Sequence, residues 1–409
     1  MAPKADDNGL FARAPVPVAA LDDAQRLACL RLIRSDNVGP ITFRELINHF
    51  GGATNALAAL PELARRAARG RTISICPADK AEAELEAARR HGARPLFTIE
   101  PGYPTPLAHL AVPPPLIYVK GRLDLLERDT VAFVGSRNAS AAGVALTRQL
   151  ASKVGEDGYV VVSGLARGID SAAHEATLAT GTIAVLAGGI DNVYPPENAG
   201  LQARIGEIGC LVTEQPPGYP ARGRDFRQRN RIISGLSLGV VVIEAAQRSG
   251  SLITARAAAE QGREVMAVPG HPLDPRSEGP NALLKQPGVT MVTAAADILE
   301  VLAPMRSGRR DLPTLREADA GPHAPVPGMP LAPPSAAVGG PSTTTDDSSM
   351  PEDAADALLK VLGRAPATLD DAARAAGLSA RVARIAALEL AVSGNVELHG
   401  GQFISRKPR

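Results

Sequence analysis

Residues 130–302 repeat one pattern, in which a short apolar run is followed by a glycine- or serine-bearing turn and then by a helical stretch. The runs are rich in β-branched residues and lack polar alternation, which is typical of strands buried on both faces. Strands that alternate with helices form a parallel sheet covered by helices on both sides. The sequence therefore predicts an α/β fold with a doubly wound parallel sheet. The predicted strands are Val131–Val134, Tyr159–Val162, Ile183–Leu186, Leu211–Val212, Val240–Ile243 and Val265–Val268.

Residues 22–120 are predicted to form an N-terminal helical domain and its connection to the sheet domain, 121–303. Apolar residues at helical spacing predict helices over 23–34, 41–50 and 80–92. The first two are joined by the tight turn Asn37-Val38-Gly39-Pro40, which suggests a SAM-like or helix-hairpin-helix module. Some such modules hold DNA phosphates with backbone N–H groups, but proline removes one donor. DNA contact and a structural or docking role both stay open for this turn.

Residues 304–351 contain ten prolines, together with glycine, serine and threonine runs. Such a composition buries too little apolar surface to order itself, so we expect a linker. A flexible chain of this length reaches about 35–40 Å, and the C-terminal unit is expected to be tethered rather than docked.

Residues 352–409 are predicted to form that C-terminal unit. Three helices and a hairpin on the turn Gly400-Gly401 predict a winged helix. The third helix presents Arg381 and Arg384 but also Glu389, and the hairpin is not basic. DNA reading and protein docking or self-association both remain possible for this unit.

Several features limit the class of protein. Residues 1–21 contain acids and prolines where a signal peptide would be apolar, so we expect a loose tail. No apolar run approaches the length of a membrane span, and we expect no membrane insertion. The thiols Cys29, Cys76 and Cys210 are scattered without metal-ligand spacing, which fits a cytoplasmic protein. Because the net charge is only +1, any nucleic-acid site must be a local patch.

One stretch is strongly basic: residues 222–231 hold five arginines and a single acid, Asp225. Phe226 lies among them, in a chain with 3% aromatic residues and no tryptophan. Arginines interleaved with an aromatic ring are typical of single-stranded nucleic-acid binding, because the charges follow the backbone while the ring stacks on a base. The alternative is a solvated, arginine-rich helix start.

Ligands of open parallel sheets bind beyond the carboxyl ends of the strands. Most of the predicted strands end there in turns that could accept an anion, and two of the turns carry arginines, Arg137 and Arg167. Together they favour a phosphate-bearing ligand. The turns are Gly135-Ser136-Arg137, Ser163–Asp170, Gly188–Asp191 followed by Tyr194-Pro195, Arg248-Ser249-Gly250-Ser251, and Pro269-Gly270.

The turns do not match the known mononucleotide or dinucleotide signatures. The first lacks the G-x-G-x-x-G pattern, and the chain has no G-x-x-x-x-G-K-[ST] loop. His174 has no Ser or Asp partner at catalytic spacing, so we interpret it as a structural or helix-surface residue. The sequence shows no nucleophile–base pair and no metal-ligand cluster, so it predicts no catalytic residues, no metal and no cofactor.

Six motifs in order carry a resemblance: GSR, SGLARGID, GGIDNVYP, FRQRNRIISGLS, VIEAAQRSGSLITA and AVPG. The chain resembles the DNA-processing protein A (DprA/Smf) family over roughly residues 100–300. The resemblance implies a Rossmann-like core that binds single-stranded DNA, works as a homodimer and loads the RecA recombinase during natural transformation. It also implies a protein that is not an enzyme.

The motifs of the family place its DNA pocket on particular residues of this chain. By that resemblance, and with the turns at Gly168 and at Ser249 and Gly250 added, the candidate DNA-binding set is Ser136, Arg137, Ser163, Gly164, Arg167, Gly168, Phe226, Arg229, Asn230, Arg231, Ser249 and Gly250. Some members have lysine after the Tyr-Pro pair, where this chain has Pro196. That departure leaves more of the positive charge to the arginines.

The basic stretch is predicted to form a helix capped by Asp225, with Phe226 and Asn230 on one face and Arg229 beside them. In this interpretation Arg222 and Arg224 only steer the strand in. A rival hypothesis is a nucleotide-processing enzyme, because related α/β sheets include phosphoribohydrolases. Its only close acid would be Glu244, at the end of the fifth predicted strand.

Overall fold

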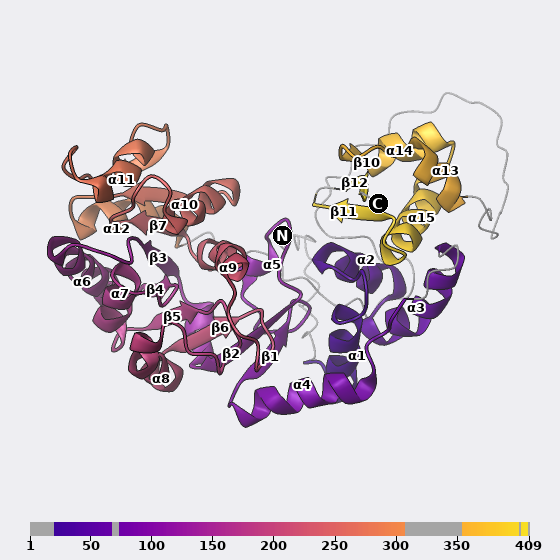
Figure 1. Cartoon of the computed structure of the whole chain (residues 1–409), viewed down its shortest axis with the longest axis horizontal. Helices are drawn as coiled ribbons and strands as arrows, with labels where there is room; N and C mark the ends of the chain where they lie inside the picture. The colour runs from indigo at the N-terminus through magenta and orange to yellow at the C-terminus, as the bar shows by residue number, and fades with distance from the viewer. Residues whose placement is uncertain (1–19, 68–72, 307–353, 401, 408–409) are drawn as a thin grey trace, which may run out of the picture.

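The structure is a computed structural model that describes residues 20–67, 73–306, 354–400 and 402–407 (Figure 1). The N-terminal helices and the C-terminal unit lie side by side, and the sheet core lies at the other end of the molecule. Most of the predicted tail and linker, 1–19 and 307–351, lies outside the described residues. In the part of the chain that is described, no helix has the length and apolar character needed to cross a bilayer.

The core is one nine-stranded sheet in the order β1-β2-β6-β5-β4-β3-β7-β8-β9. The strands from β3 to β9 are parallel, which confirms the predicted doubly wound sheet. Every predicted strand lies within a residue or two of an observed one. The strands are β1 Arg94–Phe97, β2 Leu116–Gly121, β3 Thr130–Val134, β4 Val160–Ser163, β5 Thr182–Val185, β6 Cys210–Thr213, β7 Gly239–Val242, β8 Glu264–Ala267 and β9 Val289–Met291.

The strand β3 shows why these runs lack polar alternation. Val131 and Phe133 pack into the apolar core on one face of the sheet, and Ala132 and Val134 pack into the core on the other. Both faces are covered by helices, so every position of the strand is buried. The helices around the sheet are α5 Thr105–Ala108, α6 Ala141–Glu156, α7 Ile169–Thr177, α8 Ala199–Ile208, α9 Gly223–Leu236, α10 Gly250–Glu260, α11 Glu278–Leu283 and α12 Ala295–Leu302.

Two antiparallel strands extend the sheet beyond the predicted domain boundary at 120/121. Strand β2 crosses that boundary and pairs with β6, and β1 pairs with β2. The sheet domain therefore includes residues that we had assigned to the N-terminal domain and its connection. The pattern of short runs did not reveal them, because β2 finds its partner about ninety residues further along the chain.

The N-terminal helices are α1 Asp23–Ile33, α2 Pro40–Phe50, α3 Ala53–Ala67 and α4 Ala78–Arg90. Their apolar core is continuous with that of β2, since Leu46 and Leu60 share one cluster with Tyr118. Arg34 also donates to the Glu84 carboxylate on α4 at 2.7 Å, and the Tyr118 hydroxyl donates to the same carboxylate. The helical module is thus fixed to the β1–β2 end of the sheet.

The C-terminal unit contains α13 Ala354–Val361, α14 Leu369–Ala376 and α15 Ala380–Val392, with a small sheet in the order β10-β12-β11. Its strands are β10 Ala367–Thr368, β11 Val396–His399 and β12 Phe403–Arg406. The three helices and the hairpin agree with the predicted secondary structure, and the assignment to the winged-helix class stays a prediction. The expectation that this unit is tethered rather than docked is wrong, because α15 packs against α2 and α3.

Candidate nucleic-acid interface

The turns after β3 and β4 interlock at the carboxyl edge of the sheet. Gly168 has φ +78°, and a Cβ there would lie 2.3 Å from the Ser136 carbonyl oxygen. The Ile169 N–H donates to the same carbonyl at 3.3 Å. The structure therefore brings together Ser136, Arg137 and the 163–168 turn, as the sequence predicted for the rim of the site.

The backbone of the β4 turn is already occupied by a carboxyl group of the chain itself. Asp170 accepts hydrogen bonds from the N–H groups of Gly164 and Ala166 at 3.2 and 3.3 Å. Burial raises the pKa of Asp170, and the nearby Arg229 guanidinium opposes that shift. The Ser163 hydroxyl is also used internally, since it donates to the Phe133 carbonyl at 2.6 Å. This turn was predicted to be ready for an anion, but an internal carboxyl group fills it.

The start of α6 is filled in the same way. Glu244, at the end of β7, accepts from the Ser140 backbone N–H at 2.9 Å and from the Ser140 hydroxyl at 2.5 Å. A Cβ at Gly143 would lie 2.6 Å from the Glu244 carboxyl carbon, so the first turn of α6 closes around this side chain. Glu244 was the acid of the rival enzyme hypothesis, and here it serves as a helix-terminal anion.

Helix α9 crosses behind these turns and packs on β3, β4 and β5. It begins at Gly223, so the predicted cap Asp225 lies in its first turn, where the Asp225 carboxylate accepts from the N–H of the actual N-cap residue, Arg222, at 2.9 Å. Its buried residues include Ile232, Ile233 and Leu236, which anchor the helix in the core. Helix α9 thereby carries the basic stretch to the same edge of the sheet as the β3 and β4 turns.

Arg229 does not present its charge to solvent. The side chain is 6% exposed, and its Nη1 donates to the Gly164 carbonyl at 2.6 Å and to the Val185 carbonyl. Burial lowers the pKa of Arg229 to about 10, and the neighbouring Arg137 adds to the shift. Arg229 was predicted to contact DNA directly. It instead fastens α9 to the ends of β4 and β5, and it adds positive potential from below the surface.

Arg231 and Asn230 are also bound to the chain. Arg231 donates to the Val112 carbonyl at 3.0 Å and forms an ion pair with Glu214. The Asn230 amide donates to the Gly250 carbonyl at 3.0 Å, which joins α9 to the start of α10. Ser249 caps α10 by accepting from the Ser251 N–H. These four predicted site residues, Asn230, Arg231, Ser249 and Gly250, thus have structural partners that explain their presence.

The exposed part of the candidate site is an aromatic and arginine cluster. Phe226 is half-buried, with the Arg137 guanidinium carbon 5.4 Å and that of Arg229 5.9 Å from its ring centroid. The Tyr194 ring lies 5.1 Å from the Phe226 ring at an interplanar angle of 57°, and Tyr194 is 46% exposed. We call Arg137, Tyr194 and Phe226 the aromatic cluster. An aromatic surface beside a cation is the arrangement that stacks bases and holds phosphates.

Exposed arginines extend from the aromatic cluster. Arg167 is 57% exposed and faces Glu197 at 3.7 Å, a distance and exposure at which the ion pair is weak. Arg222, Arg224 and Arg227 are exposed on the first turns of α9 or just before it. The sequence analysis placed Arg229 in the pocket and Arg222 and Arg224 in a steering role. The structure shows the opposite exposure: Arg229 is buried, whereas Arg222 and Arg224 are exposed to solvent.

Comparison with known proteins agrees with this architecture. The model of the family described as DNA recombination-mediator protein A matches residues 94–303, and that of the DprA-like N-terminal HHH domain matches residues 23–87. The chain belongs to this family. The first match begins at β1, which supports including β1 and β2 in the core.

Individual relatives cover about half of this chain. The chain is 42% identical over 221 residues to the DNA processing protein DprA of Bacillus subtilis, covering 53% of this chain and 74% of that protein. It is 46% identical over 203 residues to the protein Smf of Escherichia coli, covering 49% of this chain and only 54% of that relative. The X-ray structure of DprA from Streptococcus pneumoniae aligns with a TM-score of 0.51 at 39% identity, over 55% of this chain and 77% of that one.

Tyr194 is a candidate site residue that the sequence-based set did not include. It lies in the GGIDNVYP motif of the family, after β5, and the motif was noted without assigning the ring a role. Its position in the sequence could have identified it, because Tyr194 follows a strand end at the ligand-binding edge in a chain with only five tyrosines. Pro196, which follows at the position where some members have lysine, is exposed near this ring.

His174 is confirmed as a structural residue rather than a helix-surface one. It is fully buried, and its Nδ1 lies 2.7 Å from the Thr182 hydroxyl oxygen. That hydroxyl donates to the Val161 carbonyl, so it accepts from Nδ1–H, which leaves Nε2 without a proton. Burial, with a smaller effect of Arg229, lowers the pKa of His174 to about 3. The imidazole of His174 is therefore neutral in the folded sheet domain at neutral pH.

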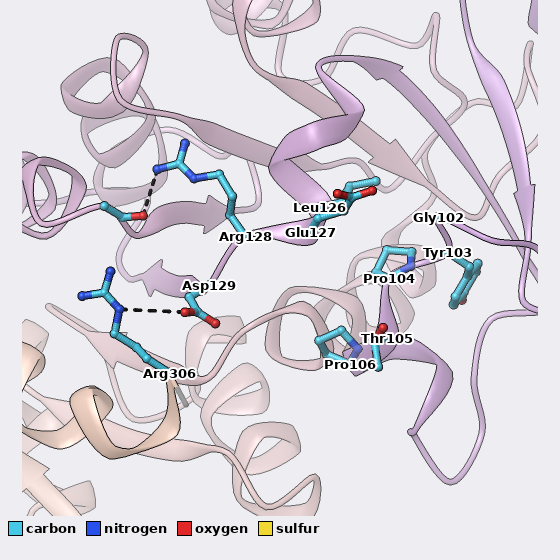
Figure 2. Close-up of a pocket in the computed structure, with 11 residues that line it drawn as sticks. Gly102, Tyr103, Pro104, Thr105, Pro106, Leu126, Glu127, Arg128, Asp129 and Arg306 are labelled. Atoms are coloured by element: carbon cyan, nitrogen blue, oxygen red, sulfur yellow. Dashed lines mark hydrogen bonds and ion pairs between the residues drawn. The ribbon is translucent and has the colours of Figure 1, made fainter. Parts of the chain in front are cut away.

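A cavity of about 530 Å³ lies at the other edge of the sheet, where the parallel strands begin (Figure 2). Its arginines, Arg128 and Arg306, already have partners within the chain. Arg128 donates to the carbonyls of Thr180 and Gly158, and Arg306 donates to the Asp157 carboxylate at 3.0 Å and faces Asp129. Because its cations have partners and it lies away from the aromatic cluster, this cavity is not part of the candidate nucleic-acid interface.

Proposed function

We propose that the chain is a single-stranded DNA-binding recombination mediator without catalytic turnover. It would protect incoming DNA and load the RecA recombinase during natural transformation, acting in the cytoplasm as a homodimer. Membership of the DNA recombination-mediator family supports this role. The single observation that carries the DNA-binding part is the aromatic cluster, in which Arg137 and Tyr194 flank Phe226 at the ligand-binding edge of the sheet.

The proposed binding mode follows from which groups are accessible. Tyr194 offers the more exposed ring, so we assign it the main stacking contact and Phe226 a supporting one. Arg137, Arg167 and the exposed arginines at the start of α9 would follow the phosphates. A base in a duplex is already stacked on its neighbours, and its ring face is not available to Tyr194. The arrangement therefore favours single strands and tolerates any sequence.

The carboxyl edge also argues against a nucleotide-processing enzyme. Such an enzyme requires a free acid or base and an open phosphate turn near the strand ends. Glu244 is bound to Ser140, and the β4 turn holds Asp170. The two groups that the rival hypothesis needs are thus both in use within the described part of the chain.

The test is a binding titration with a labelled oligonucleotide, single-stranded and duplex, across a range of salt concentrations. We expect tighter binding to the single strand and a log K that falls linearly with log salt. Equal affinity for the two forms, or no salt dependence, would refute the proposal. RecA loading is tested separately, by following RecA assembly on single-stranded DNA already covered by a single-strand-binding protein.

A further inference from the structure

Helix α15 of the C-terminal unit has two apolar faces. Leu390 and Ala391 pack into the core of the C-terminal unit itself. Leu388 and Val392, 1% and 0% exposed, belong instead to the core of the N-terminal module, together with Phe43 and other residues of α2 and α3. A helix that is apolar on opposite sides is a buried helix, whereas a duplex-reading helix keeps one face polar and free. In Figure 1 α15 lies directly beside α2 and α3.

The turn between α1 and α2 supplies a specific polar contact at the end of α15. The side-chain amide of Asn37 donates to the Val392 carbonyl at 3.0 Å. Asn37 has φ +61°, a left-handed conformation that asparagine tolerates better than most residues. A Cβ at Gly394 would lie 2.9 Å from the Asn37 side-chain oxygen, so the two turns fit closely. One of the last carbonyls of α15 is thereby satisfied by the N-terminal module.

The hairpin of the C-terminal unit makes a third contact, with the sheet domain. A Cβ at Gly400, in the turn between β11 and β12, would lie 3.2 Å from the Cβ of Ala111. Ala111 precedes Val112, whose carbonyl accepts from Arg231 on α9. The C-terminal unit therefore contacts both other parts of the chain, by α15 on one side and by its hairpin turn on the other.

We propose that α15 is an intrachain docking helix, and that the groove of α2 and α3 together with the Asn37 turn is its binding site. The C-terminal unit then connects the N-terminal module to the sheet domain and stabilises their arrangement, and it does not act as a second DNA-binding domain. This assigns a role to the Asn37-Val38-Gly39-Pro40 turn, for which DNA contact and docking had both remained open. It also accounts for the environment of His49 on α2, where burial, and then the charges of Arg381 and Arg384, lower the pKa of that histidine.

The first test is a cysteine pair in the full chain, Ala111→Cys with Gly400→Cys. Disulfides require Cβ atoms about 3.5–4.5 Å apart, so the sites need to separate by only a few tenths of an ångström. The native cysteines Cys29, Cys76 and Cys210 are buried and serve as the background in the wild type. We expect an intrachain crosslink, seen as a faster-migrating monomer without reductant. Free, maleimide-reactive thiols after oxidation, or an interchain dimer band, would overturn the docked arrangement.

The crosslinked pair also separates docking from DNA reading. If α15 is a docking helix, the oxidised protein should bind duplex and single-stranded DNA with the same affinity as the reduced protein, within about twofold. If α15 has to leave its groove to read a duplex, duplex affinity would fall on oxidation and return on reduction, which would overturn the proposal. Both readouts compare one protein with itself, and neither depends on RecA loading.

Amide hydrogen exchange provides a second, independent measurement. In the full chain, Asn37→Ala with Val392→Ala should speed exchange in α2 and α3 as well as in α15. The matched control is Leu359→Ala, since Leu359 packs against the core of the C-terminal unit. It should speed exchange within residues 354–406 alone. Unchanged exchange in α2 and α3 of the docking variant would overturn the proposal.

Discussion

The guanidinium of Arg229 lies against the backbone of Gly164, which accepts from Arg229 Nη1 at 2.6 Å. A Cβ at position 164 would lie 2.6 Å from the guanidinium carbon. The guanidinium cannot move aside freely, because it also donates to the Val185 carbonyl. Glycine at 164 is thus what allows α9 to be fastened to the ends of β4 and β5.

We expect Gly164→Ala to lower the free energy of unfolding by about 1–3 kcal/mol, because the added methyl group displaces the Arg229 side chain from two backbone acceptors. Urea denaturation measures the change. Gly200→Ala is the matched control, since nothing lies within 4 Å of a Cβ there and Gly200 is in helix α8. The control should have equal or higher stability. If both variants unfold at the wild-type midpoint, the close approach at Gly164 has no energetic importance.

Arg229→Met should destabilise the fold by about 3 kcal/mol, because it leaves the Gly164 and Val185 carbonyls without their donor. Arg227→Ala changes an exposed arginine two residues earlier on the same helix. It should leave the free energy of unfolding within about 0.5 kcal/mol of wild type. It should also weaken single-strand binding and reduce the slope of log K against log salt by about 0.7. The opposite assignment, with Arg227 structural and Arg229 in direct contact with DNA, predicts the reverse pattern.

Tyr194→Ala should weaken single-strand binding by about 1–3 kcal/mol, the typical contribution of one stacked base, with little change in stability because the ring is exposed. Tyr194→Phe keeps the ring and should bind as the wild type does. Fluorescence anisotropy at one fixed salt concentration compares the three proteins. A loss of affinity in Tyr194→Phe would mean that the hydroxyl, rather than the ring, makes the contact.

His174 should make the fold sensitive to acid. As the pH falls below about 6.5, the unfolded chain protonates this imidazole, whereas the folded chain does so only near its lowered pKa of about 3. The contribution of His174 is therefore complete above pH 6.5 and is lost progressively toward pH 3, by at most about 1.4 kcal/mol per pH unit. His174→Asn should show a shallower fall in the free energy of unfolding between pH 7 and 5. Equal slopes would mean that the pKa of His174 is not lowered in the folded protein.

The sequence predicts those elements whose structure depends on residues close together in the chain. The run Val240–Ile243 predicts β7, observed at Gly239–Val242, because a β-branched segment with no polar position is buried wherever it pairs. Asp225 predicts the start of α9 to within three residues, because its carboxylate accepts from the backbone N–H of Arg222, the residue before the helix. Both predictions depend on neighbours in the chain.

The errors concern contacts made over long distances in the sequence. The sequence of the arginine stretch does not show whether its side chains lie at the surface or bind inside the chain. Arg229 is buried because it donates to the carbonyls of Gly164 and Val185, which lie 65 and 44 residues away in the sequence. Asp170 and Glu244 looked like residues beside open phosphate turns, but they fill those turns themselves. The docking of α15 depends on Asn37, 355 residues from its partner.

The two internal carboxyl groups, of Asp170 and Glu244, have a consequence for selectivity in a cell. Helix starts and glycine turns at this edge are where mononucleotides and coenzymes bind in related sheets, and here two of them, the β4 turn and the start of α6, are filled by these carboxyl groups. Free ATP or NAD would lack these two phosphate-binding turns and would compete poorly. A polymer can instead engage Arg137, Arg167 and the arginines of α9 at once, and its affinity grows with each added contact. The protein would thus recognise a strand by its length, and remain unoccupied among the small nucleotides that surround it.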